Sequence, residues 1–338
     1  MEKKDKLFIH PADNGGILMT KFEPKTLKVI PVILLMLLFA VGCASGAEKT
    51  DNSSSGTTPS ETAAGENEKD PIIFSDPVFE KLLKAELEKD EIFPRDLDKY
   101  TWVGIGGDHF MQLAGGDVKA KSIILFFGTE VELEGVRYKG FGTMKTLDDL
   151  KHFKNLNALN VTLQPEIDFS TIPDDVLGRL VNIIVTQSKL KDISFVTGAK
   201  NLKSINLAFG EVSDLSPLSE CKELLYLSGS NNPLQDLSPI SGLTKLRSIS
   251  FYSSQIKDLT PLAGLVNLET LELYNNQVED ISPLKGLKNL KELELIDNKV
   301  KDVSPLKEFE SFEELRLNGN PVENIELLDH IENLEFEG

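Results

Sequence analysis

The side chains that most often carry chemistry in proteins are few in this sequence and lie far apart. The four histidines do not show the spacing of metal ligands. They are His10, His109, His152 and His330. Cys43 and Cys221 do not form the pattern of a disulfide framework. Gly106-Gly107-Asp108-His109-Phe110 is similar to the GGDEF signature of nucleotide cyclases, but those enzymes need a far larger α/β domain around the motif, so it is most simply a glycine turn. The sequence therefore makes no positive case for an enzyme, a cofactor or a metal, and an enzymatic site within residues 88–145 is the least favoured alternative.

Carboxylates recur at a fixed spacing in the second half of the chain. The string D-[L/I/V]-[S/T]-P-[L/I] appears five times, each copy 22 residues after the last. Its aspartates are Asp214, Asp236, Asp258, Asp280 and Asp302. Asp192 begins a copy without proline, and Asn324 begins a degenerate one. One carboxylate per repeat, placed before a Ser-Pro step, satisfies backbone groups more simply than it binds calcium. Periodicity this strict predicts a repeat protein.

Each period predicts a strand, a turn and a short helical segment. In the clearest copy, Leu293 and Leu295 alternate as the buried face of a strand. Asn298 follows, and its amide can satisfy backbone groups where the chain leaves the strand. Ser304-Pro305 then suggests an N-cap and a first-turn proline. One such coil cannot bury its own leucines, but stacked coils can.

The same offsets predict eight strands, with an incomplete ninth beginning at Leu334. The leading leucines and their equivalents are Leu156, Leu180, Leu202, Leu224, Leu246, Leu268, Leu290 and Phe312. Cys221 takes a position that other repeats fill with leucine, so we expect it to be a small buried apolar side chain. The predicted fold is an α/β solenoid with one parallel sheet. Strands about 4.8 Å apart would make that sheet about 35 Å long.

Over residues 146–338 the chain resembles the internalin-type leucine-rich-repeat family, with its pattern LxxLxxLxLxxNxIxDISPL. The resemblance implies a right-handed coil with a concave parallel sheet and short 3-10 or helical segments on the convex side. It implies recognition of another macromolecule but does not name the ligand, because members of the family bind different partners.

The residues before the repeats predict a small α+β cap over 71–145. Residues 72–87 have helical spacing, and Asp76-Pro77 suits an N-cap with a first-turn proline. Residues 101–145 are rich in glycine and strand formers and predict strands or a hairpin. Such a cap would cover the first coil of a solenoid.

The N-terminal region predicts export and lipid anchoring. Residues 29–42 are an apolar run preceded by lysines, and Ala40-Val41-Gly42-Cys43 resembles a bacterial lipobox. Residues 1–42 would then be a signal peptide and Cys43 the lipidated N-terminus; an ordinary signal or an N-terminal anchor is the alternative. Residues 43–70 have the composition of a flexible tether. Translation from Met19 would give the signal a more usual length. This layout is typical of a lipoprotein on the outer face of the cell membrane, as in Gram-positive bacteria.

The strand pattern also predicts where a partner would bind. Residues flanking the buried leucines form three columns on the concave side. The selected residues are Tyr226, Glu292 and Glu314 in the first column, Glu272, Glu294 and Arg316 in the second, and Tyr252, Tyr274 and Ile296 in the third. Exposed tyrosines favour recognition, and carboxylates steer a basic protein ligand. Tyrosines that only stabilise the sheet by stacking are one alternative. A structural protein that binds cell-wall polysaccharide is another. The net charge of −18 argues against nucleic acid.

Overall fold

The computed structural model describes residues 69–115 and 140–337, together with five strands outside those ranges. Those strands are β1 (Leu7–Pro11), β2 (Ile17–Lys21), β5 (Ile124–Phe127), β6 (Glu130–Leu133) and β7 (Val136–Lys139). β1 pairs antiparallel with β2, and β5, β6 and β7 form a separate antiparallel sheet. The strands predicted between residues 101 and 145 therefore form.

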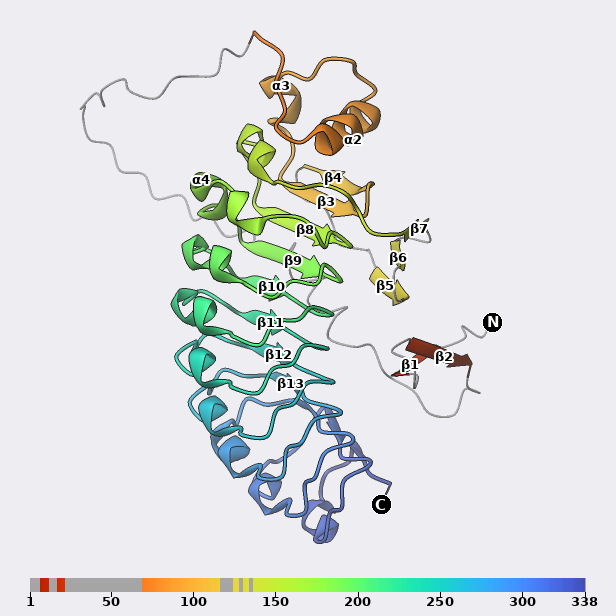
Figure 1. The fold of residues 1–338 in the computed structure, drawn as a ribbon. Coiled ribbons are helices and arrows are strands. Elements are labelled where there is room, and N and C mark those ends of the chain that lie inside the picture. The colour runs from red at the N-terminus through yellow and green to blue at the C-terminus, as the bar shows by residue number, and fades with distance from the viewer. Residues whose placement is uncertain are drawn as a thin grey trace, which may run out of the picture.

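The solenoid is built on one curved sheet of 11 strands in the order β16 to β8, then β3 and β4 (Figure 1). All its neighbours pair in parallel except β3 and β4, which are antiparallel. The strands are β3 (Trp102–Gly106), β4 (Phe110–Ala114), β8 (Ala158–Thr162), β9 (Asn182–Thr186), β10 (Ser204–Asn206), β11 (Tyr226–Ser228), β12 (Ser248–Ser250), β13 (Thr270–Glu272), β14 (Glu292–Glu294), β15 (Glu314–Arg316) and β16 (Leu334–Glu335). The eight predicted repeat strands are β8 to β15, and β16 is the short ninth. The solenoid prediction is confirmed.

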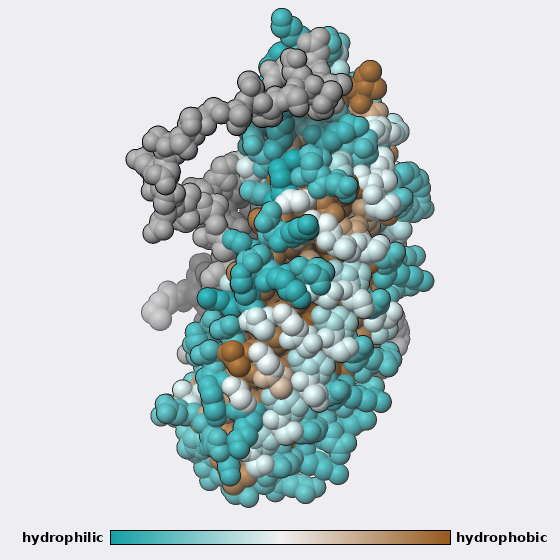
Figure 2. All heavy atoms as spheres, turned by 90° about the vertical axis from the view of Figure 1, so that its left-hand side faces the viewer, coloured by the Kyte–Doolittle hydropathy of each residue, from teal (hydrophilic) through white to brown (hydrophobic). Residues whose placement is uncertain are grey.

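Short 3-10 helices line the side of the coils opposite the sheet. They are η2 (Asp148–His152), η3 (Phe169–Thr171), η4 (Ser194–Gly198), η5 (Ser216–Glu220), η6 (Ser238–Ile240), η7 (Thr260–Leu262), η8 (Ser282–Gly286), η9 (Ser304–Leu306) and η10 (Ile325–Leu328), with the α-helical turn α4 (Asp174–Leu177) between η3 and η4. Figure 2 looks onto this side, where hydrophilic residues predominate and hydrophobic ones form only small spots.

Repeated aspartates hold the start of these helices, as the sequence predicted. Each accepts a hydrogen bond from the backbone N–H two residues on, at 2.7 to 2.8 Å from Asp192 through Asp302. The N-cap prediction for Ser304 was wrong. Ser304 is the first residue of η9, and the buried Val303 precedes it in the cap position without a side-chain bond. The carboxylate of Asp302 therefore provides the cap.

Stacked leucines and a column of asparagines join consecutive coils. The leucines at the repeat positions are almost fully buried, and Cys221 is 1% exposed in the place of one of them. Burial raises the pKa of the Cys221 thiol to about 11, so it stays protonated and unreactive at neutral pH. Asn298 accepts a hydrogen bond from the N–H of Val278 at 2.9 Å and donates to the carbonyl of Leu273 at 2.8 Å. Asn232, Asn276 and Asn320 make equivalent bonds.

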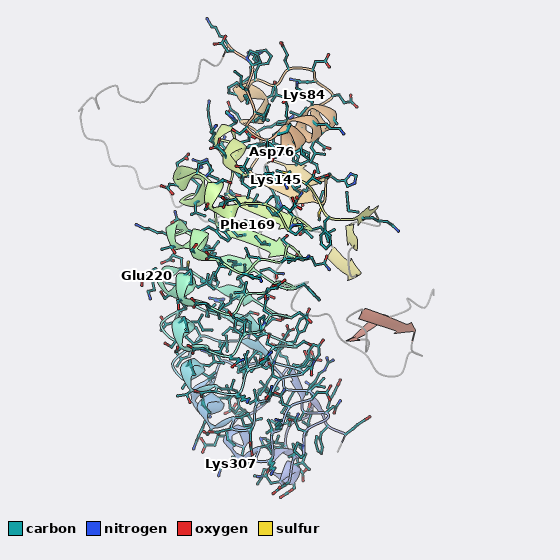
Figure 3. All side chains as sticks on the ribbon, viewed as in Figure 1. Asp76, Lys84, Lys145, Phe169, Glu220 and Lys307 are labelled. Atoms are coloured by element: carbon teal, nitrogen blue, oxygen red, sulfur yellow. The ribbon has the colours of Figure 1, made fainter. Side chains whose placement is uncertain are left out.

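The cap is fastened to the first coils by two buried carboxylates. Helix α2 (Pro77–Leu87) begins after Asp76, which accepts from the N–H groups of Val78 and Phe79 as predicted. The second oxygen of Asp76 accepts from the N–H of Lys145 at 2.8 Å, and Figure 3 labels the two residues one above the other next to α2. Asp149 in turn accepts from the N–H of Asp76 at 2.8 Å. Helix α3 (Pro94–Leu97) follows α2.

The sequence pattern missed that the cap contributes a strand to the main sheet. β3 pairs in parallel with β8, in the register Trp102 to Ala158 through Gly106 to Thr162. The expected glycine turn then leads from β3 to β4, with Gly107 at a φ of 58°. The cap thus extends the sheet by two strands, β3 and β4.

Candidate functional site

The register of the strands forms the three predicted concave columns. Thr270 lies opposite Glu292, and Glu272 opposite Glu294, while Leu271 and Leu293 between them point into the core. Beyond the ends of the strands the backbones of adjacent coils remain in register. There the N–H of Ser253 donates to the carbonyl of Tyr274 at 3.0 Å. The selected side chains therefore lie on adjacent coils of one face.

Tyr252 and Tyr274 form a parallel stacked pair. Their ring centroids are 4.9 Å apart and their planes differ by 11°. Burial raises the pKa of Tyr252, and Tyr274 and then Glu272 and Glu294 raise it further. The pKa of Tyr274 is also raised, chiefly by burial. Both phenols therefore stay neutral at physiological pH, beside carboxylates.

Arg316 is the centre of an ion-pair network at the end of the acidic cluster. Its guanidinium lies 3.4 Å from Glu294 and 3.2 Å from Glu335, and it also pairs with Glu314. Glu292 is held separately, since it accepts a hydrogen bond from the Thr270 hydroxyl at 3.1 Å. Arg316 is 5% exposed and is engaged within the chain rather than presented to solvent.

Ionisation of two carboxyls of this network is less favourable in the folded chain than in water. Burial raises the pKa of Glu294 and of Glu314, although the positive charge of Arg316 opposes the shift. A raised pKa in the folded chain means that ionising these groups works against folding. Residues kept in such a state are candidates for a functional role.

The selected residues are less accessible than the sequence suggested. Glu272 and Arg316 are buried, and the other seven are half-buried rather than fully exposed. Stacking within the tyrosine pair, the alternative to recognition, does occur. Glu335 was missed, because it belongs to the short ninth strand, whose pattern is degenerate. We call Tyr252, Tyr274, Glu292 and Glu294 the acidic tyrosine surface.

Other predicted features are outside this surface or outside the described residues. Cys43, the apolar run of residues 29–42 and the predicted tether up to residue 68 lie outside the described residues. Within the described part of the chain, no helix is long and apolar enough to cross a membrane. The same part contains no group of three or more side chains suited to hold a metal ion.

Comparison with known proteins supports the fold. The family model described as Leucine Rich repeats (2 copies) matches residues 266–308. The solved structure of internalin C2 from Listeria monocytogenes is similar over 81% of this chain and 100% of its own, with a TM-score of 0.57 and 24% identity. Internalin F from the same organism is similar over 78% of this chain and 95% of its own, with a TM-score of 0.51 and 22% identity.

These similarities and the coil geometry define the class of fold, which is a leucine-rich-repeat solenoid. Its coils have the form found in the internalins, so the predicted resemblance is confirmed at the level of fold. No curated protein is similar enough in sequence to serve as a relative. Solenoids of this class present extended concave surfaces that are commonly used for protein recognition rather than catalysis.

Proposed function

We propose that the chain is an exported, lipid-anchored protein that recognises another protein through the concave face of its last coils. The observation that carries this proposal is the stacked, half-buried pair of Tyr252 and Tyr274 beside carboxylates. Rigid aromatic side chains offer a large contact area with little conformational entropy to lose on binding. The outer face of a Gram-positive membrane is the proposed location.

Replacing the tyrosine pair tests the recognition surface. We expect Tyr252→Ala/Tyr274→Ala to abolish capture of the protein partner from surface extracts. The free energy of unfolding should fall by a few kcal/mol, because the half-buried rings lose apolar burial as well as their stacking, while the circular dichroism spectrum should show that the solenoid still folds. Tyr252→Phe/Tyr274→Phe keeps the stack and is the matched control. Full binding by the alanine variant, or a preference for purified cell-wall polysaccharide over protein, would contradict the proposal.

Lipid anchoring through Cys43 is tested separately. The lipobox-like Ala40-Val41-Gly42-Cys43 supports thioether attachment of lipid at Cys43. Cells fed a radiolabelled fatty acid should label the native chain and not Cys43→Ser, and only the native chain should fractionate with membranes. Cys221→Ser is the control, since that thiol is buried. Equal labelling of Cys43→Ser would rule the anchor out.

A further inference from the structure

The concave face carries an excess of negative charge that the chain does not balance. Arg316 is the only basic residue at the concave positions of β8 to β15. It contacts three carboxylates, those of Glu294, Glu314 and Glu335. Glu292 adds a fourth and is bonded to a neutral hydroxyl. These four carboxylates and one guanidinium leave a formal charge of −3, so an added cation would be attracted to this face.

The tyrosine pair offers a second source of attraction for a cation. Each ring has a negative face, and the parallel stack covers only one face of each ring. Glu294 is close enough to affect the titration of both phenols. An ammonium or guanidinium group placed here would meet ring faces and a carboxylate together.

Two buried hydroxyls beside this surface lack partners. The Oγ atoms of Ser228 and Ser248 have no hydrogen-bond partner among the residues that the structure describes. Ser228 is 0% exposed and Ser248 is 2% exposed, and both face the concave side. Ser248 lies in the column of Thr270 and Glu292. Leaving a buried hydroxyl unbonded is costly, and an N–H group of a ligand would satisfy it.

We propose that the acidic tyrosine surface binds the cationic side chain of a lysine or arginine in an exposed segment of the partner protein. This inference rests on the proposed function and specifies the chemistry of the partner. The ammonium or guanidinium would lie against the tyrosine rings, with Glu292 and Glu294 as counter-charges. Ser228 and Ser248 lie on β11 and β12, two or three strands from these carboxylates, so their hydroxyls would accept from other N–H groups of the same segment. A protein segment is favoured because the face extends over several coils, more than a single small cation would cover.

Hexalysine is a suitable probe, used with the full chain in titration calorimetry. We expect Glu292→Gln/Glu294→Gln to weaken hexalysine binding roughly tenfold, which equals about 1.4 kcal/mol. Glu279→Gln/Glu310→Gln removes the same charge at two exposed residues away from the sheet and should leave binding unchanged within about twofold. Hexalysine acetylated at every Nζ should not bind.

Three results would overturn the proposal. Equal weakening by the two double variants would show general attraction to an acidic protein. Binding of the acetylated peptide would show that the cation is not recognised, and spermidine binding as tightly as hexalysine would show a site for small cations. If the alanine variant of the tyrosine pair loses the natural partner while the glutamine variant at Glu292 and Glu294 keeps hexalysine, the recognition function stands and the cationic subsite fails.

Discussion

Asn298 shows how a single side chain can join two coils. Its oxygen accepts from the N–H of Val278 in the preceding coil, and its nitrogen donates to the carbonyls of Leu273 and Leu295. All three backbone groups are buried, where water cannot replace the bonds. Side chains with both a donor and an acceptor are required here, which explains the recurrence of asparagine at this position.

Substitution of Asn298 should therefore reduce the stability of the fold more than most single substitutions do. We expect Asn298→Ala to lower the free energy of unfolding by about 1–3 kcal/mol, because buried groups lose their partners. Asn289→Ala is the matched control, since Asn289 is exposed and donates one bond to the carbonyl of Val266. Urea denaturation measures both. Equal losses for the two variants would show that the buried network is not the cause.

Within the short helical elements, the aspartates make stability depend on pH. Hydrogen bonds from the side chain and backbone two residues on hold the pKa of Asp214, Asp236 and Asp258 below the ordinary value of 3.8. A pKa lowered by folding gives stability that is present above pH 3.8 and lost as the pH falls through the folded value. Glu294 and Glu314 act oppositely, because their raised pKa values make folding easier as the pH falls toward 4.5.

A triple variant isolates the contribution of these elements. The thermal midpoint of the native chain should fall steeply below pH 3.8. The midpoint of Asp214→Asn/Asp236→Asn/Asp258→Asn should fall less, because the asparagines carry no titrating proton and can still cap the 3-10 helices. Calorimetric scans between pH 5 and pH 2.5 measure the difference. Parallel curves for the two proteins would exclude the caps as the source of acid sensitivity.

How far the sequence predicts an element depends on how closely it follows the repeat. β14 was predicted from Leu293 and Leu295 because both leucines and the following asparagine are in place. Strands were predicted over residues 101–145, but the place of β3 in the main sheet was missed. Trp102-Val103-Gly104-Ile105-Gly106 has no leucine pattern, and only its pairing with β8 makes it a coil strand. The network of Arg316 was missed for a related reason, since ion pairs depend on side-chain conformation rather than on period.

At the scale of the whole molecule, each coil contacts only its neighbours, so stability is local along the solenoid. The hydrophobic core is nevertheless continuous from Phe79 in the cap to Ile331 near the end of the chain. The cap matters because it covers the leucines of the first coil. Asp149 connects these parts, since it accepts from the N–H groups of Ser75 and Asp76 while lying in η2.

Loss of this connection should loosen one end of the solenoid first. We expect Asp149→Ala to cost about 3 kcal/mol, because two backbone N–H groups lose a charged acceptor. Amides of α2, β3 and β8 should then exchange with deuterium faster, while those of β12 to β14 keep their protection.

Asp148→Ala is the adjacent control. Its carboxylate is half-exposed and accepts only from exposed side chains, Lys151 at 2.6 Å and the Ser75 hydroxyl at 2.8 Å, so its loss should cost less than about 1 kcal/mol. Uniform acceleration of exchange along the whole sheet would mean that the coils unfold as one unit. Acceleration confined to the first strands would show that the cap protects the first coils while the concave surface of the last coils keeps its form.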